Sequence, residues 1–288
     1  EARVALSTVD VDGARKNLQT LKSLKFDEAR EQARNSWNKL LGRIEIDAPL
    51  SQKRIFYTAL YHALIHPSDI ADSDGRVRGP QGEVISTQSG HYYSTLSLWD
   101  TFRAVHPLFT LIVPERVGGM IETLLAHHAQ QGFLPIWTAW GRETYCMIGN
   151  PSLPVIADAV TKGFKGFDHQ QALRAMVETS TNSRNQAPQW AQRSWDLLNN
   201  YGYLPYDLEP NGEAVSKTLE YGYGDDAVAR VAQAMAQNET ALRFSQRAKS
   251  YKNLWDPSTR VMRGRNSQGK WREPFNPDTP TSPLNNPG

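Results

Sequence analysis

Aromatic and charged side chains occur together in two short stretches of this chain. Trp99 and Asp100 are adjacent near the start of an apolar segment, and residues 137–146 include two tryptophans, an arginine, a glutamate and a tyrosine. Aromatic rings suit flat amphipathic ligands, above all sugars, because the C–H face of a pyranose ring packs on a π face. A neighbouring carboxylate can accept hydrogen bonds from two adjacent hydroxyls. The two stretches are therefore candidates for carbohydrate binding.

The same residues also have ordinary structural interpretations. Asp100 lies near the N-terminus of an expected helix, where a carboxylate caps the helix or complements its dipole. Arg142 and Glu143 could form a surface ion pair, which would add little stability. Solvated, capping or packed positions are expected for three further carboxylates and the single thiol, namely Glu220, Asp225, Asp226 and Cys146.

Other chemical motifs fail on their spacing. The acidic segment 69–75 suggests calcium, but with Gly75 at position 6 of an EF-hand loop, positions 1 and 12 are Ile70 and Gln81. The seven histidines show no metal-ligand spacing, and the chain has no G-x-S-x-G, P-loop or Gly-rich dinucleotide motif. The sequence thus lacks these local motifs, and an acidic turn is the better interpretation of 69–75.

Composition narrows the class of protein. The chain has 288 residues and a formal net charge of +2, so it lacks the electrostatic footprint of a nucleic-acid binder. Its mean hydropathy is −0.56, and apolar runs such as Leu108–Val113 fall far short of the roughly 20 residues that a bilayer requires. A single cysteine excludes an internal disulfide framework. Because the chain begins at Glu1, we expect a processed form or an excised piece.

Hydrophobic periodicity predicts a helical chain. A helical stretch is expected over 11–40, with Ala29, Ala33, Trp37, Leu40 and Leu41 on one face and a stop at Gly42. Residues 69–93 are expected to form a loop or short hairpin, and 256–288 a long loop. The remaining expected helices are Gln52–Ile65, Leu98–Leu111, Arg116–Gln131, Pro154–Lys162, His169–Ser180, Ala187–Asn199, Val215–Ala236 and Glu239–Leu254.

One turn motif occurs twice. Gly-Phe-Leu-Pro at 132–135 and Gly-Tyr-Leu-Pro at 202–205 each follow an amphipathic helix. Glycine tolerates the positive φ that ends a helix, and proline cannot continue one. The repeat favours a stack of αα-hairpins whose loops at one end form a pocket. Two unrelated helix stops remain the alternative.

Five blocks of the sequence carry a family resemblance, and their order and spacing agree with it over nearly the whole chain. The chain resembles glycoside hydrolase family 92, the calcium-dependent, exo-acting, inverting α-mannosidases. The blocks are SLWDTFRAVHPLFTLIVPE at 97–115, GFLPIWTAWGRETYCMIGN at 132–150, PVIADAVTKG at 154–163, VSKTLEYGYGDDAVARVA at 215–232 and YKNLWDPSTRVMRGRNSQGKW at 251–271.

The resemblance implies an all-α fold that is part of an (α/α)6 toroid. Residues 1–48 would be a helical linker that follows an N-terminal β-sandwich, and residues 49–288 would be the first portion of the catalytic domain, apparently truncated. By the family's pattern, Trp99, Asp100 and Trp137 would contact mannose, with Arg142 and Glu143 beside them. Pro151 departs from the pattern, which has a histidine near this position.

The resemblance also implies where the reacting groups would be. The general acid would be a glutamate in a block following 274–277, the general base an aspartate further on, and a His-Gly-Asn-Glu block between them would contribute to the calcium site. None of these blocks occurs before Gly288. We therefore expect this chain to contribute substrate-binding loops, but no catalytic residue and no main metal ligand.

The function implied is hydrolysis of terminal α-linked mannose from mannose-containing glycans, N-glycans among them, with Ca²⁺ as cofactor. Two alternatives stay open: another (α/α)6 glycosidase of trehalase or glucosidase type, and a non-catalytic carbohydrate-binding fragment. We expect no nucleic-acid partner and no membrane span. Exposed apolar helix faces would favour self-association or association with the missing part of the domain. The family implies a periplasmic or secreted location.

Overall fold

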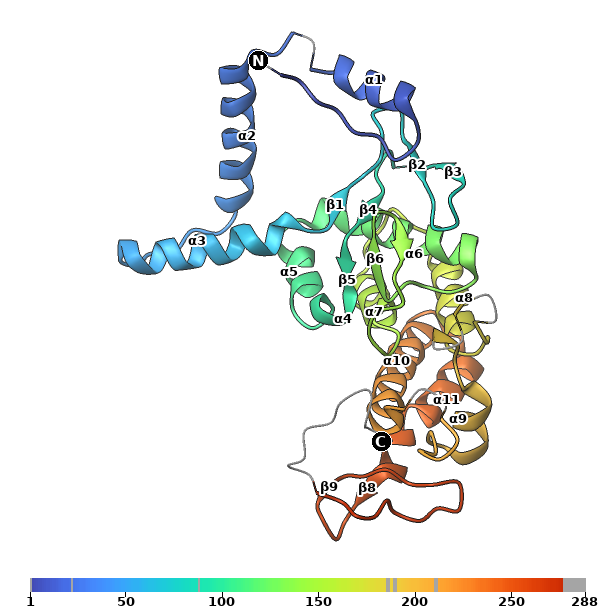
Figure 1. Ribbon diagram of the computed structural model, residues 1–288. Helices are drawn as coiled ribbons and strands as arrows, with labels where there is room; N and C mark the ends of the chain where they lie inside the picture. The colour runs from blue at the N-terminus through green and yellow to red at the C-terminus, as the bar shows by residue number, and fades with distance from the viewer. Residues whose placement is uncertain are drawn as a thin grey trace.

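The computed structural model describes residues 2–21, 23–87, 89–184, 187–188, 191–209 and 212–276. Helices dominate this part of the chain (Figure 1). They are α1 (Val11–Gln19), α2 (Phe26–Leu41), α3 (Leu50–Ile65), α4 (Leu98–Thr101), α5 (Val105–Ile112), α6 (Pro114–Gln131), α7 (Ser152–Thr161), α8 (His169–Thr179), α9 (Trp195–Tyr201), α10 (Ala214–Ala234), α11 (Asn238–Arg247) and the 3₁₀ helix η2 (Ser250–Leu254).

Most of the expected helices are confirmed, and four differ from the expectation. The stretch 11–40 is divided into α1 and α2. The stretch 98–111 is divided into α4 and α5, because Ala104 leaves the helical region at φ −144°. Of the helix expected over 187–199, the described residues form α9 only from Trp195 onward. The last expected helix ends at Arg247 and continues as the separate turn η2.

Short antiparallel strands make the all-α expectation incomplete. The hairpin expected within 69–93 is confirmed, and residues 255–262 form a hairpin where a loop was expected. The pairs and sheets are β1 (Ser68–Asp69) with β4 (Tyr93–Ser94), β2 (Arg76–Arg78) with β3 (Val84–Ser86), β5 (Leu96–Ser97) with β6 (Trp137–Ala139) and then β7 (Arg142–Glu143), and β8 (Trp255–Asp256) with β9 (Val261–Met262).

The apolar core lies where α6, α7, α8 and α10 pack together. Helix α10 is buried on most of its circumference, which is the pattern of a central helix. Glycines permit close contacts of α6 and α10 with their neighbours. A Cβ on Gly118 of α6 would lie 2.6 Å from the Lys165 carbonyl oxygen, and a Cβ on Gly224 of α10 would lie 3.1 Å from Leu153 Cδ1. Fully buried core side chains include Phe109, Ile121, Leu124, Leu134, Leu153, Ile156, Met176 and Phe244.

The repeated turn has the same geometry in both places. Gly132 ends α6 with φ 80°, and Gly202 ends α9 with φ 72°. The leucine two positions after each glycine is buried, and its N–H donates to a threonine hydroxyl. Leu134 donates to Thr179 at 2.9 Å, and Leu204 donates to Thr218 at 3.0 Å. The alternative of two unrelated helix stops does not account for this shared anchoring.

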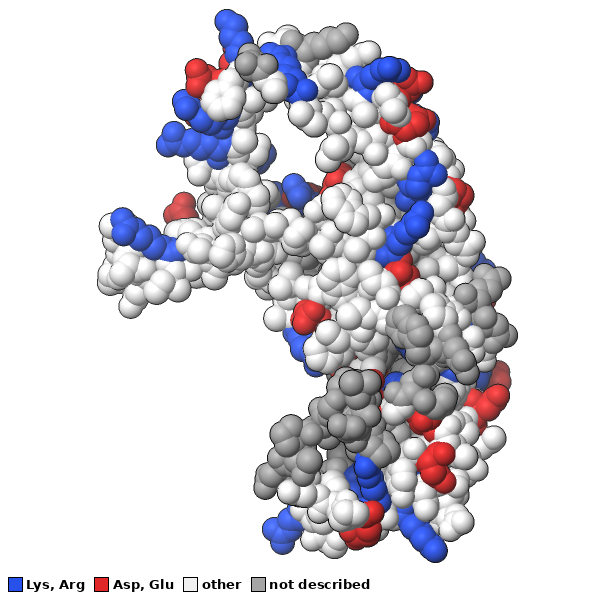
Figure 2. All heavy atoms as spheres, viewed as in Figure 1, with Lys and Arg blue, Asp and Glu red and all other residues white. Residues whose placement is uncertain are grey.

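The N-terminal helices extend away from the body. Figure 1 shows α3 as an arm with α2 turned up from it, and no residue of α2 is fully buried. The expected apolar stripe is used at its C-terminal end: Leu40 and Leu41 pack against the main core, and the ring of Trp37 lies 4.6 Å from that of Tyr61. Ile55 of α3 is 72% exposed. On the face in Figure 2, blue and red side chains are interspersed, consistent with the low net charge. None of the described helices has the length and apolarity to cross a bilayer.

Two fully enclosed histidines predict acid sensitivity. Burial lowers the pKa of His106 to about 4 and that of His127 to about 3. The unfolded chain binds protons on these residues near pH 6.5, whereas the folded chain does not. The free energy of unfolding should therefore fall as the pH decreases from 6.5 to 4, by up to about 1.4 kcal/mol per pH unit for each histidine.

Urea unfolding across this pH range measures the effect. His127→Leu removes one titrating group, so the slope of the free energy of unfolding against pH should decrease by the equivalent of about one proton. His62 is exposed, and His62→Gln should leave this slope unchanged. Equal slopes in the parent and in His127→Leu would contradict the conclusion that burial lowers the pKa of His127.

Candidate functional site

A three-stranded sheet brings the two candidate stretches together. Ser97 at the end of β5 pairs with Trp137 of β6, and Thr138 pairs with Glu143 of β7. Helix α4 begins directly after β5. Trp99 and Asp100 therefore follow the end of β5 that pairs with Trp137. Residues almost 40 positions apart thus meet through the pairing of two short strands.

Helix α4 leaves one carboxylate, that of Asp100, accessible to a ligand. The hydroxyl of Ser97 donates a hydrogen bond to one Asp100 oxygen, while the Asp100 side chain stays exposed. Trp99 is half-buried, and its side chain helps to lower the pKa of Glu220 through a hydrogen bond, so the indole N–H is not free for a ligand. The guanidinium of Arg103 lies 4.7 Å from the centre of the Trp99 ring and holds it in place by a cation–π contact. An aromatic ring and an exposed carboxylate therefore lie on one turn.

Glu143 has a structural role that the sequence did not reveal. Its carboxylate accepts backbone N–H bonds from Ile136 at 2.5 Å, Trp137 at 3.3 Å and Tyr145 at 2.7 Å. Burial raises the pKa of Glu143, and these donors act in the opposite direction. The interpretation as an ion pair with Arg142 is wrong, because Arg142 is exposed on the other face of β7. Glu143 positions Trp137 rather than facing solvent.

Glu220 of α10 was expected to be solvated or capping, and this expectation is wrong. Its carboxylate lies 3.5 Å from Arg103, and only one fifth of the side chain is exposed. Burial raises the pKa of Glu220, whereas Arg103 lowers it. Gly149 makes the approach possible, since a Cβ there would lie 3.0 Å from the Cβ of Glu220. No local sequence signal distinguishes Glu220, because its environment comes from residues 70 or more positions away.

Two buried arginines lie behind the loop 144–150. Arg184 donates to Asn150 at 2.9 Å and packs 4.4 Å from the centre of the Phe133 ring. Arg193 donates to the Gly149 carbonyl at 3.3 Å. Burial and the charge of Arg193 lower the pKa of Arg184 to about 9. The two guanidinium groups fix the end of the loop, and the sequence analysis did not identify them.

The loop that these groups hold is strained. Tyr145 and Met147 of this loop have positive φ values of 57° and 71°, and Trp140 in the preceding β6–β7 turn has a φ of 52°. Non-glycine residues adopt this conformation only where the surroundings impose it, and such residues cluster at functional sites. Trp140 is 75% exposed. Cys146 was expected to be packed, but it is exposed. The loop thus presents side chains that a globular core would normally enclose.

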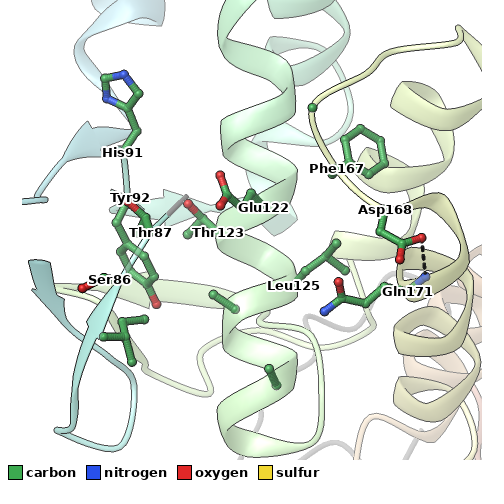
Figure 3. Close-up of a pocket in the computed structure, with 14 residues that line it drawn as sticks. Ser86, Thr87, His91, Tyr92, Glu122, Thr123, Leu125, Phe167, Asp168 and Gln171 are labelled. Atoms are coloured by element: carbon green, nitrogen blue, oxygen red, sulfur yellow. Dashed lines mark hydrogen bonds between the residues drawn. The ribbon is translucent and has the colours of Figure 1, made fainter. Parts of the chain in front are cut away.

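A separate cavity of about 390 Å³ lies between the β3–β4 segment, α6 and the start of α8 (Figure 3). Several of its polar groups already have partners: Asp168 caps α8 through Gln170 and Gln171, and Thr123 accepts from Tyr93. None of the five candidate sugar-binding residues lines it. The cavity does not coincide with the candidate site.

The described residues contain no group of three or more histidine, cysteine or acidic side chains that could hold a metal ion. Calcium prefers six to eight oxygen ligands, with several carboxylates among them. Asp100 and Glu220 alone do not make such a set, so this part of the chain does not fit a complete calcium site. Pro151, where the family pattern has a histidine, directly precedes α7 and offers no ligand atom.

The glycosyl hydrolase family 92 catalytic domain matches residues 13–286. The chain belongs to family 92. The family 92 α-mannosidase BT3965 from Bacteroides thetaiotaomicron superposes with a TM-score of 0.90 at 39% identity over 96% of this chain. The same enzyme in complex with mannoimidazole gives a TM-score of 0.87 at 40% identity over 94% of this chain and 35% of its own.

A second family 92 enzyme from the same organism, the inverting mannosidase BT2199, has 31% identity and a TM-score of 0.84. The match covers 94% of this chain and 37% of BT2199. The match to BT3965 without a ligand covers 36% of that enzyme. The chain therefore spans about a third of these family 92 enzymes. A search of curated proteins finds no match.

The three bonds to Glu143 predict a large difference between neighbouring residues of β7. Glu143→Ala would leave three backbone N–H groups without their acceptor, at about 1–3 kcal/mol for each donor that stays buried. Ile136 is fully buried, whereas Trp137 and Tyr145 are half-buried, so we expect the free energy of unfolding to fall by about 1–3 kcal/mol. Arg142→Ala should change it by less than about 0.5 kcal/mol, because Arg142 is exposed. Similar urea midpoints for the two variants would refute this role of Glu143.

Proposed function

We propose that this chain forms the sugar-binding portion of an inverting exo-α-mannosidase that releases terminal α-linked mannose from glycans. The observation that carries the proposal is the pairing of β5 with β6, which brings Trp99 and Asp100 to the same sheet edge as Trp137. The BT3965 complex with mannoimidazole supports a mannose-like ligand for the family. Family membership supports the glycosidase chemistry.

In this proposal each group contacts a defined part of the sugar. The rings of Trp99 and Trp137 pack against the apolar C–H face of mannose. The carboxylate of Asp100 accepts hydrogen bonds from adjacent hydroxyls, and Ser97 fixes its orientation. Glu143 and the arginine pair hold the loop, so that the binding surface is formed before the sugar arrives.

The architecture proposed is an incomplete (α/α)6 toroid over 49–288, with 1–48 as the helical linker. The helical core around α10 and the two equivalent glycine turns support it. An inverting glycosidase needs an acid and a base roughly 6.5–9.5 Å apart. We propose that this pair, and the oxygen ligands for calcium, come from outside the described residues. We further propose a periplasmic or secreted location and contact of the exposed α3 face with the rest of the domain or a second copy.

Binding and hydrolysis test different parts of this proposal. Isothermal titration of this chain with mannoimidazole should give measurable affinity, and Asp100→Ala should weaken it about tenfold or more, because a hydrogen bond to a charged group is lost. Asp27→Ala, an exposed carboxylate on α2, is the matched control and should bind as the parent does. Equal affinities for all three proteins would eliminate Asp100 from the site.

Mannose release from α-mannobiosides, with calcium or with EDTA, tests the catalytic part. We expect no release by this chain, and calcium-dependent release by a longer chain that carries the acid, base and metal blocks of the family. Calcium-dependent release by these 288 residues alone would show that the catalytic pair lies within them. Inactivity of both chains on mannosides, with activity on trehalose or a glucoside, would overturn the choice of substrate.

A further inference from the structure

One side chain of α10 touches both stretches of the candidate site. The carboxylate of Glu220 lies 3.5 Å from the guanidinium of Arg103, and only one fifth of the Glu220 side chain is exposed. The Trp99 side chain donates a hydrogen bond to the same carboxylate. Gly149, at the end of the loop 144–150, lies against it as well, because a Cβ on Gly149 would be 3.1 Å from Oε2 of Glu220. Glu220 therefore joins α4 and this loop to the central helix.

Helix α4 cannot hold the Trp99 ring by itself. It has only four residues, Leu98–Thr101. A single helical turn is not stable alone, so its side chains depend on contacts with other elements. Leu98 is fully buried and fixes the backbone of the turn. The half-buried Trp99 ring contacts Arg103, whose guanidinium lies 4.7 Å from the ring centre, and it bonds to Glu220.

Both of these contacts use the charge of Glu220. In the part of the chain that the structure describes, Glu220 is the one acidic residue within 4 Å of the Arg103 guanidinium. A cation–π contact attracts the guanidinium to the ring, and a hydrogen-bonded counter-charge keeps it there. Burial raises the pKa of Glu220, and the contacts with Arg103 and Trp99 favour its ionised form. The carboxylate thus restrains the Trp99 ring by two routes.

We propose that Glu220 is a positioning residue of the sugar site, which orients the Trp99 ring directly and through Arg103. This inference rests on the proposed function, in which Trp99 packs against the C–H face of mannose. The variant Glu220→Gln keeps the length of the side chain and one acceptor oxygen. It removes the charge that Arg103 and the indole N–H both use.

Selective ¹⁵N labelling of the eight tryptophans tests the orientation directly, because each indole N–H gives its own resonance. Trp99→Phe identifies the Trp99 resonance by its loss. We expect Glu220→Gln to shift this resonance more than any other, because the hydrogen bond to a charged acceptor is lost. Asp226→Asn removes an exposed carboxylate from the same helix and should leave the resonance in place. An unmoved Trp99 resonance in Glu220→Gln would overturn the proposal.

Titration with mannoimidazole tests whether this orientation serves the sugar. Glu220→Gln should weaken binding about fivefold or more, whereas Asp226→Asn should bind as the parent does. The loss should be smaller when Glu220→Gln is made in Trp99→Phe, because the two residues act through one contact. Unchanged affinity in Glu220→Gln, or equal losses in both backgrounds, would overturn the proposal. Absence of binding by the parent chain would count against the proposed function, and the indole resonance would then decide the role of Glu220 alone.

Discussion

The buried carboxylate of Glu143 is the acceptor around which the candidate site is organised. An isolated carboxylate in a protein interior is costly, and it becomes tolerable when several donors point at it. Here the donors are main-chain N–H groups of Ile136, Trp137 and Tyr145, so the same three bonds that solvate the charge also fix the backbone on both sides of the β6–β7 turn. The position of the Trp137 ring follows from this arrangement.

Charged side chains in the rest of the fold are used in a similar way. Burial raises the pKa of Asp225 to about 6, while Arg247 opposes that rise. The pair connects α10 to α11, and through the Ser180 carbonyl to the end of α8. A buried ion pair of this kind adds little net stability over apolar packing, but removing one partner leaves an uncompensated charge. Its effect is therefore to specify how these helices sit against one another.

The sequence predicted the features that depend on local patterns, namely helices and turns. Helix periodicity located most helices, and the Gly-aromatic-Leu-Pro repeat located two turns whose glycines both adopt positive φ. It could not predict burial that arises from distant residues. Asp225 and Glu220 have the same local appearance as solvated helix carboxylates, and only their contacts with Arg247 of α11 and with Arg103 distinguish them. Cys146 has apolar neighbours in sequence, yet the strained loop turns it outward.

The two equivalent turns have the same backbone geometry but lie in different surroundings. In both, glycine ends a helix and the next leucine donates to a threonine on a neighbouring helix, so the backbone leaves the core in the same manner. After Leu134 the chain continues into Ile136 and Trp137, which donate to Glu143, and an aromatic edge results. At the second turn Gly202 lines a cavity that arginines of α11 and a lysine of η2 also line. The turn fixes where the chain goes, and the residues packed against it decide which ligand chemistry the surface can offer.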